Sequence, residues 1–316
     1  MLSKKVHGRQ MFKMKSALTA LSFSALIAGC SEPVSDIDIP DTGAAMIVEA
    51  SLAYGETDTR IAAAVYDSGQ PTPMIGGNVI EVTSESSTAI LSGIDDRDNF
   101  YSGRIDVPNP DTDTIKVAIA HRPQETRQER WYPTEEILVD PGPGELEGFE
   151  ATLLLPTTVE ITAPQPGLIY SSRDDIIPLE WTGEPGDDFK MVIYNRCRSS
   201  TNSDDLSWVY TSRIDDDQQE NIRIGDIIPA TGVLETSANL GGVVTGFVQL
   251  FAELALSAVT LGLYEPTEIN FDEFQLDYCT IQLSLVRQRQ GILGEDFSGG
   301  SVTGSRSDSL QLEYRP

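Results

Sequence analysis

Histidine is nearly absent from this sequence, and its absence excludes several kinds of active site. The 316 residues include two histidines, and only His121 lies beyond residue 30. Zinc sites take most of their ligands from histidine and cysteine, so the sequence does not favour one. A Ser-His-Asp triad would have to use His121, and the chain has no Gly-x-Ser-x-Gly turn for the nucleophile. We therefore interpret His121 as a polar residue at the end of a strand.

Positive charge is also scarce. The chain carries 22 Lys+Arg against 49 Asp+Glu, a formal net charge of −27, and beyond residue 30 its only lysines are Lys116 and Lys190. This charge repels nucleic-acid phosphates and anionic lipid headgroups, so we expect no nucleic-acid partner. Salt screens such repulsion over about 10 Å, so the composition suits a salty medium. Nothing in the sequence implies a cofactor or a resident metal.

Cysteine is the third rare residue, and Cys30, the first of three, follows an N-terminal segment of distinctive composition. An apolar run begins near Ser16 and is preceded by no acid and by five cations, which are Lys4, Lys5, Arg9, Lys13 and Lys15. A basic region, a short apolar region and small residues before the cut are the three parts of a secretory signal. We therefore expect residues 1–29 to be a signal peptide.

The end of this segment, Ile27-Ala28-Gly29-Cys30, resembles the lipobox of bacterial lipoproteins. The resemblance implies that Cys30 is thioether-linked to diacylglycerol, becomes the new N-terminus and is then N-acylated. Two or three acyl chains hold a soluble domain on a bilayer for long periods. By family analogy, Ser31 at the next position favours the outer membrane. The alternatives are an ordinary signal peptide, or a buried helix, that happens to contain a cysteine.

After Cys30 the chain changes character twice. Residues 30–43 are acidic, contain proline and lack periodicity, which is typical of a flexible tether. From residue 44 apolar residues alternate with smaller or polar ones in short runs, at 46–54, 61–65, 80–82, 115–119 and 149–155. Turn residues separate these runs and no long helical pattern intervenes. The pattern predicts a β-sandwich over residues 44–156.

A second β-sandwich is expected over residues 157–316. The sequence of residues 161–181, ITAPQPGLIYSSRDDIIPLEW, resembles the opening of fibronectin type III and immunoglobulin-like domains. The resemblance implies a proline-rich bend and a strand that leads to a buried tryptophan, here Trp181. Later strands are expected at 188–197, 274–289 and 309–314. The fold class is therefore mainly β, with two Ig-like sandwiches in tandem, an arrangement similar to that of bacterial surface lipoproteins.

Cys197 and Cys279 are the thiols that remain after Cys30. Each is in phase with the apolar residues of its expected strand, so both should point toward the core. Outside the cytoplasm an even pair of cysteines usually oxidises. We therefore predict a Cys197–Cys279 disulfide, which would close a loop of about 80 residues and contribute about 4 kcal/mol. The alternative is two independent buried thiols.

One apolar segment interrupts the β pattern. Between Gly241 and Leu263 the only charge is Glu253, and apolar residues recur at helical spacing, with Phe247 and Phe251 at the centre of the stripe. We expect an amphipathic helix inserted at about 237–263. The helix either docks on the sandwich or presents Phe247 and Phe251 to a partner protein or lipid. A membrane span is the third alternative.

Two kinds of charged cluster remain as candidate sites. The acidic stretches at 95–99 and 215–217 could bring oxygens to calcium, but they lack EF-hand spacing, so we interpret them as solvated turns. Four arginines near the ends of two expected neighbouring strands could receive a carboxylate from a partner or glycan: Arg196, Arg198, Arg287 and Arg289. Pairing of these arginines with acids of the chain itself is the favoured alternative.

The sequence favours a non-enzymatic, membrane-anchored lipoprotein with a structural or binding role at the bacterial cell envelope. We expect it at the outer membrane, on the periplasmic face, with an envelope protein or glycan as partner. A second hypothesis is an accessory subunit of an export or assembly machine that docks through residues 241–263. A third is a carbohydrate-active or cell-wall enzyme that uses a carboxylate pair, which spacing alone does not test.

Overall fold

The computed structural model describes residues 39–75, 77–94, 97–122, 144–185, 187–199, 206–236, 238–239, 267–271 and 275–316, all within one compact unit, Ser31–Pro316. Cys30, the signal peptide, most of the tether, Asp95 and Asp96, and the inserted helix with Phe247 and Phe251 lie outside the described residues. No helix in the described part of the chain is long and apolar enough to cross a membrane.

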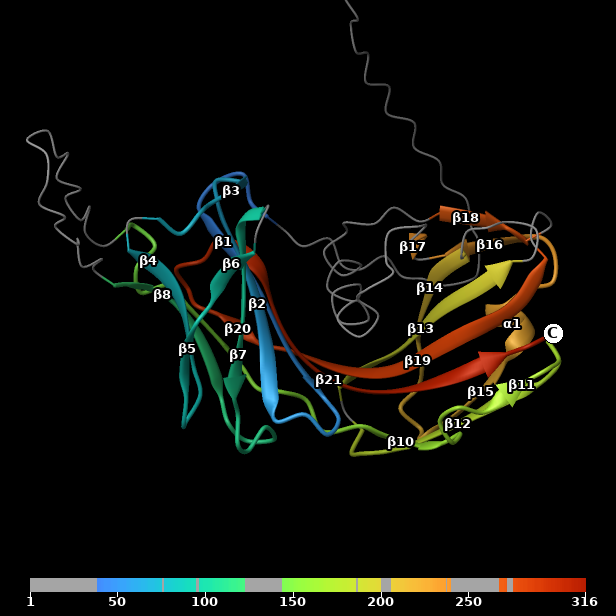
Figure 1. The fold of residues 1–316 in the computed structure, drawn as a ribbon. Coiled ribbons are helices and arrows are strands. Elements are labelled where there is room, and N and C mark those ends of the chain that lie inside the picture. The colour runs from blue at the N-terminus through green and yellow to red at the C-terminus, as the bar shows by residue number, and fades with distance from the viewer. Residues whose placement is uncertain are drawn as a thin grey trace, which may run out of the picture. The chain divides into compact units, whose positions relative to one another are not determined.

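The described chain is mainly β and its largest sheet has eleven strands (Figure 1). Nine of them follow one another in hydrogen-bonded order: β17 (Ala238–Asn239), β14 (Leu206–Arg213), β13 (Asp188–Ser199), β19 (Leu276–Gln290), β21 (Gly299–Tyr314), β1 (Ala44–Ala53), β2 (Asp58–Asp67), β7 (Arg97–Asp106) and β6 (Ser92–Ile94). Off this path, β11 (Ile169–Tyr170) pairs with β21, and β3 (Gln70–Pro71) pairs with β2.

The first sandwich combines one half of this sheet with a second sheet of five strands. In order these are β20 (Ile292–Leu293), β9 (Glu150–Leu153), β8 (Ile115–His121), β4 (Asn78–Thr83) and β5 (Thr88–Ile90). One apolar cluster lies between the two layers and takes Met46 and Val65 from the large sheet, Ile80 and Ile119 from the five-stranded sheet, and Leu155 from the chain after β9. The alternation predicted from the sequence is confirmed for most of the expected core positions, which are buried, but it is wrong for Tyr54 at the end of the first run, which is 49% exposed.

The second sandwich packs the other half of the large sheet against three strands: β10 (Glu160–Ala163), β12 (Ile176–Thr182) and β15 (Gln219–Arg223). The short helix α1 (Ile224–Ile227) follows β15, and β16 (Val233–Thr236) pairs with β18 (Thr267–Asn270). Its core contains Trp181, which is 2% exposed, so the buried tryptophan implied by the Ig-like resemblance is confirmed. The strands expected at 188–197 and 274–289 are observed as β13 and β19.

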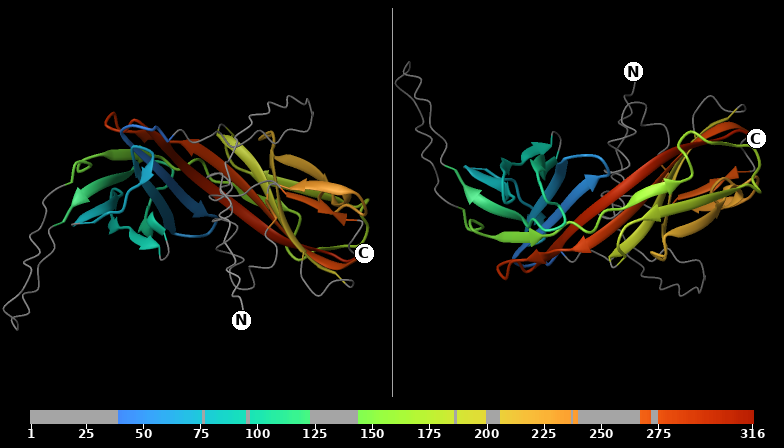
Figure 2. Two further views of the ribbon diagram at one scale, coloured as in Figure 1. Left: turned by 90° about the horizontal axis from the view of Figure 1, so that it is seen from above. Right: turned by 90° about the horizontal axis from the view of Figure 1, so that it is seen from below.

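One strand, β21, belongs to both sandwiches. Residues 299–307 pair in parallel with β1, and residues 303–314 pair in antiparallel fashion with β19. Val302 lies in the first core, whereas Leu310 lies in the second. The ribbon views show β21 running through both sandwiches (Figures 1 and 2). The strand expected at 309–314 is therefore the end of a much longer one. The boundaries 44–156 and 157–316 stay a prediction, but residues 299–307 contribute a strand to the first sandwich.

The close approach of β21 to β1 depends on glycine. Gly300 has a φ of +118°, and a Cβ at this position would come within 2.1 Å of the Met46 carbonyl oxygen. Any other residue would be strained by this φ and would also displace the neighbouring backbone. Gly300 thus allows the shared strand to enter the first sandwich beside β1.

Candidate functional site

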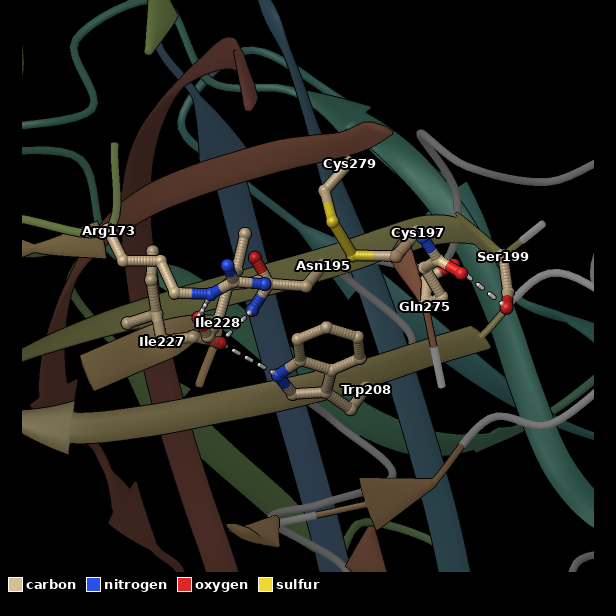
Figure 3. The surroundings of a disulfide bond; sticks show 9 residues. All are labelled: Arg173, Asn195, Cys197, Ser199, Trp208, Ile227, Ile228, Gln275 and Cys279. Carbon is tan, nitrogen blue, oxygen red and sulfur yellow. Dashed lines mark hydrogen bonds between the residues drawn. A yellow bond between two sulfur atoms is a disulfide. The ribbon is translucent and has the colours of Figure 1, made fainter. Parts of the chain in front are cut away.

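The predicted disulfide between Cys197 and Cys279 is confirmed. The two residues face each other directly on the antiparallel neighbours β13 and β19, and both side chains are fully buried (Figure 3). The alternative of two independent thiols is wrong. In antibody domains the conserved disulfide joins the two sheets. Here it joins adjacent strands of one sheet, so it crosslinks the chain across 82 residues without bridging the layers.

A set of polar side chains beside the disulfide binds the carbonyl groups at the end of α1. Trp208 Nε1 donates to the Ile227 oxygen at 3.2 Å, and Asn195 Nδ2 approaches the same oxygen at 3.5 Å. Arg173 Nε donates to the Ile228 oxygen at 3.0 Å (Figure 3). The last carbonyls of a helix lack partners within the helix, so these donors satisfy them. This network stabilises the second core.

Asn195 is the unusual member of this network, because it is fully buried and its Oδ1 has no hydrogen-bond partner among the described residues. A buried amide oxygen without a partner costs free energy. One neutral oxygen supplies neither charge nor the several converging polar groups that ligand sites present. We therefore treat Asn195 as an incompletely hydrogen-bonded residue of the core and not as a binding residue.

A second set of buried polar contacts is centred on the guanidinium of Arg287 on β19. The guanidinium is fully buried, and its Nη2 lies 2.7 Å from Asp216 Oδ2. The other oxygen of Asp216 accepts a hydrogen bond from Trp181 Nε1 at 2.9 Å, and the guanidinium carbon lies 5.1 Å from the centre of the Phe189 ring. A buried charge is tolerated when it is paired and hydrogen-bonded, and both conditions hold for the two terminal nitrogens. The buried Nε has no hydrogen-bond partner among the described residues.

The predicted cluster of four arginines does not form. The antiparallel register places Arg287 opposite Phe189, whereas Arg196 lies opposite Thr280. Seven residues along β13 separate the two pairs, which is about 24 Å at 3.4 Å per residue. The prediction of a common cationic site is therefore wrong. The favoured alternative is confirmed for Arg287, which pairs with Asp216, and for Arg289, whose Nε lies 2.8 Å from Asp187 Oδ1.

The remaining sequence candidates lie apart from one another. His121 is half-buried at the last position of β8, opposite Asn78, so its interpretation as a strand-end residue is confirmed. Asp215 and Asp217 are exposed turn residues as expected, but the same expectation is wrong for Asp216, which pairs with the buried Arg287. Within the described ranges no group of three or more histidine, cysteine or acidic side chains is arranged to hold a metal.

A feature that the sequence did not predict is a pocket of about 470 Å³ in the first sandwich. Exposed Ile75 and Ile90 line it together with Tyr101, whose hydroxyl oxygen accepts a hydrogen bond from the Met74 amide at 2.6 Å. Its volume is in the range of small-molecule sites. The described residues that line it include no carboxylate.

No family model matches this chain, and no curated protein matches it either. Solved structures similar to it include a marsupial T cell receptor, at 8% identity and a TM-score of 0.20, over 86% of this chain and 74% of the receptor chain. CBD12 from CALX1.2 is 7% identical, with a TM-score of 0.19, over 84% of this chain and 99% of that one. At these TM-scores neither likeness supports a conclusion about this chain.

Proposed function

We propose that this chain is a lipid-anchored, non-enzymatic protein of a bacterial cell envelope, in which acyl chains on Cys30 hold the two sandwiches at the outer membrane. The observation that carries the proposal is Ile27-Ala28-Gly29-Cys30 directly after a basic and then apolar segment. Among the described residues the first strand begins at Ala44, and the acidic residues 31–43 lie between Cys30 and this strand in the sequence. Its role is structural or binding, with an envelope protein or glycan as partner.

The anchor is tested by labelling with a fatty acid. We expect wild-type protein expressed in a Gram-negative host to incorporate labelled palmitate and to sediment with membranes. Cys30→Ser should lose both properties, because the thioether has no sulfur on which to form. The matched control is Cys197→Ala with Cys279→Ala, which removes two cysteines and should still be labelled. Equal labelling of wild type and Cys30→Ser would reject the proposal.

A second candidate function is that of an accessory subunit of an envelope machine that docks through residues 241–263. The observation that favours it is the apolar composition of this segment, with Glu253 as its only charge. Thr236 of β16 lies opposite Thr267 of β18, and Ala238 and Asn239 of β17 pair with β14, so the described residues on either side of 241–263 belong to the second sandwich.

Substitutions at Phe247 and Phe251 separate docking on the sandwich from docking on a partner. Burial of each ring on the sandwich would contribute about 1.5–3 kcal/mol, so Phe251→Asp should then lower the melting temperature. If the segment binds a partner, the same change should spare the melting temperature and abolish co-purification of that partner. Gln249→Asp, which adds the same charge off the apolar stripe, is the control. We expect destabilisation.

A further inference from the structure

The connection between the two cores is very short. Leu155 is fully buried in the first core and Val159 is 1% exposed in the second, so only Pro156, Thr157 and Thr158 lie between them. We call residues Leu155–Val159 the strap. Linkers that act as hinges are exposed, flexible and make few contacts. The strap has a buried residue at each end. Burial alone therefore distinguishes it from a hinge linker.

Arg287 holds the middle of the strap. Its Nη1 donates to the Thr158 carbonyl oxygen at 2.6 Å, to the Thr157 hydroxyl at 3.0 Å and to the Thr157 carbonyl oxygen at 3.3 Å. The same guanidinium is fixed from the other side by Asp216. A planar guanidinium that binds a carboxylate and backbone oxygens together fixes both in one geometry.

Arg289, two residues further along β19, holds the beginning of the strap. Its Nη1 donates to the Leu155 carbonyl oxygen at 3.1 Å, while Nε and Nη2 bind the two oxygens of Asp187 at 2.8 and 2.9 Å. Successive side chains on one face of a strand are two residues apart, so Arg287 and Arg289 reach the same side of the sheet. Together they bind the backbone of three of the five strap residues.

Two further contacts fix the strap to the loop after β12. Thr157 Oγ1 donates to the Glu184 carbonyl oxygen at 2.8 Å. Gly183 has a φ of +132°, and a Cβ there would lie 2.3 Å from the Thr158 oxygen and 2.7 Å from Arg287 Nη1. A residue with a side chain at this position would push the strap and the guanidinium apart. The glycine thus permits the close packing of loop, arginine and strap.

The second connection between the cores is β21, which pairs with strands of both sandwiches without interruption. Arg306 on β21 lies directly opposite Arg287, and its Nη1 pairs with Asp111 in the loop between β7 and β8 of the first sandwich. Bending between the sandwiches would therefore have to distort the ladders of β21 as well as break the contacts of the strap.

We propose that Arg287 and Arg289 lock the strap, so that the two sandwiches move as a single stiff arm and not as two modules on a hinge. The inference deepens the proposed structural role and rests on it, because a stiff arm transmits position from an anchored end to a distant one. It also assigns a purpose to a buried arginine that core packing alone does not require, since apolar side chains of similar volume often stabilise a core equally well.

The lock is tested with pulsed spin-label distance measurements on the full chain in detergent. Spin labels are placed at the exposed positions Ser86, in the first sandwich, and Gln165, in the second, on non-natural side chains so that the native disulfide is kept. Wild type should give one narrow distance distribution. Arg287→Gln combined with Arg289→Gln should widen it at least twofold. Amide hydrogen exchange in the strap should become at least tenfold faster.

The matched control is Arg196→Gln combined with Arg198→Gln, two arginines at the same spacing on the same sheet but at the far end from the strap. This pair should leave the distribution and the strap exchange unchanged. Arg289→Gln and Thr157→Val, each alone, remove fewer contacts, and intermediate widening is expected for each. If the double variant does not fold, these two single variants test whether the contacts of the strap restrict movement between the sandwiches.

A broad or two-peaked distribution in wild type would overturn the proposal. So would folded Arg287 and Arg289 variants whose distribution and strap exchange match those of wild type. Because the measurement uses purified protein, it does not depend on acylation. Failure of the lock is therefore distinguishable from failure of the lipid anchor, which is scored by palmitate labelling.

Discussion

The two sandwiches share one large sheet but differ in what covers it. A five-stranded sheet covers the first core, which is mostly aliphatic, whereas three strands and a helix of four residues cover the second. The second core adds two tryptophans, a disulfide and a fully buried arginine. Apolar burial is non-directional, whereas a crosslink and a buried ion pair depend on defined geometry. The smaller covering layer is thus accompanied by a disulfide and by an ion pair whose two side chains are at most 10% exposed, whereas the ion pair of Arg306 with Asp111 in the first sandwich has an exposed carboxylate.

The largest expected effect comes from removing the disulfide. In the chain-entropy model a loop of 82 residues contributes roughly 4–5 kcal/mol. Cys197→Ala with Cys279→Ala should therefore lower the free energy of unfolding by about that amount, measured by urea denaturation. Hydrogen exchange should locate the loss in β13 and β19, with β4 and β8 unchanged. An equal loss of hydrogen-exchange protection in both sandwiches would contradict the claim that only the second sandwich depends on the disulfide.

The buried ion pair should rank second. Asp216→Ala leaves Arg287 without its carboxylate and Trp181 Nε1 without its acceptor, and breaking a buried pair from one side costs about 3–5 kcal/mol. Thermal unfolding should show a marked fall in melting temperature. The control is Asp188→Ala, which removes an exposed partner of Arg213 and should change stability by less than about 0.5 kcal/mol. Similar losses in the two variants would contradict the role given to burial.

A cavity in the first sandwich should have a smaller effect that does not depend on redox conditions. Ile119 is 1% exposed, and Ile119→Ala should cost about 3 kcal/mol in either the presence or the absence of a reductant. Wild type, by contrast, should lose stability when its disulfide is reduced. Ile292→Ala, at a position 71% exposed, serves as the control and should be nearly neutral. The comparison fails if reductant alters the cost of Ile119→Ala.

The smallest expected effect concerns Lys190. Burial lowers the pKa of its ammonium from the ordinary 10.5, an effect that Asp188 opposes and Arg213 reinforces. Because the unfolded chain then binds this proton more tightly, the charged lysine costs stability at neutral pH. The cost disappears as the pH rises through the lowered pKa toward 10.5.

Lys190→Met keeps the apolar stem and removes the charge. We expect it to be more stable than wild type at pH 7, by no more than about 0.5 kcal/mol, with a smaller difference near pH 10.5. Urea denaturation at the two pH values measures the change. Lys116→Met, at an exposed lysine paired with Glu150, is the control. A difference that grows with pH would have the wrong sign.

Periodicity in the sequence predicted which side chains are buried much better than which strands are neighbours. The alternation predicted both cores, the phase of Cys197 and Cys279 predicted their disulfide, and the Ig-like opening implied a buried Trp181. Each of these depends on residues two apart, and the pleat of a strand fixes that relation locally. Pairing between strands that are distant in the sequence has no local signal. The sequence therefore does not predict that β21 belongs to both sandwiches.

The arginines illustrate the same limit. An antiparallel register set by Cys197 opposite Cys279 places Arg287 opposite Phe189, far from Arg196. Arg287 is also in phase with Leu283 and Leu285, so a buried charge could have been expected from the sequence. The partner of Arg287 could not have been predicted from the sequence, because Asp216 is one of three consecutive aspartates that differ in no local property. The sequence does not predict the pocket beside Ile75 for a similar reason, since the pocket forms between segments whose packing has no local signal.

The position of β21 near the end of the sequence determines when the first sandwich can complete its large sheet during synthesis. Ser305 donates to the Ala50 carbonyl oxygen, so neighbouring strands of the first sandwich are joined across 255 residues. A growing chain emerges from its N-terminal side, and the first sandwich must wait for β21 until the second has been almost entirely synthesised. Contacts so distant in sequence form slowly. The first sandwich therefore lacks the strand that pairs in parallel with β1 until residues 299–307 have been synthesised.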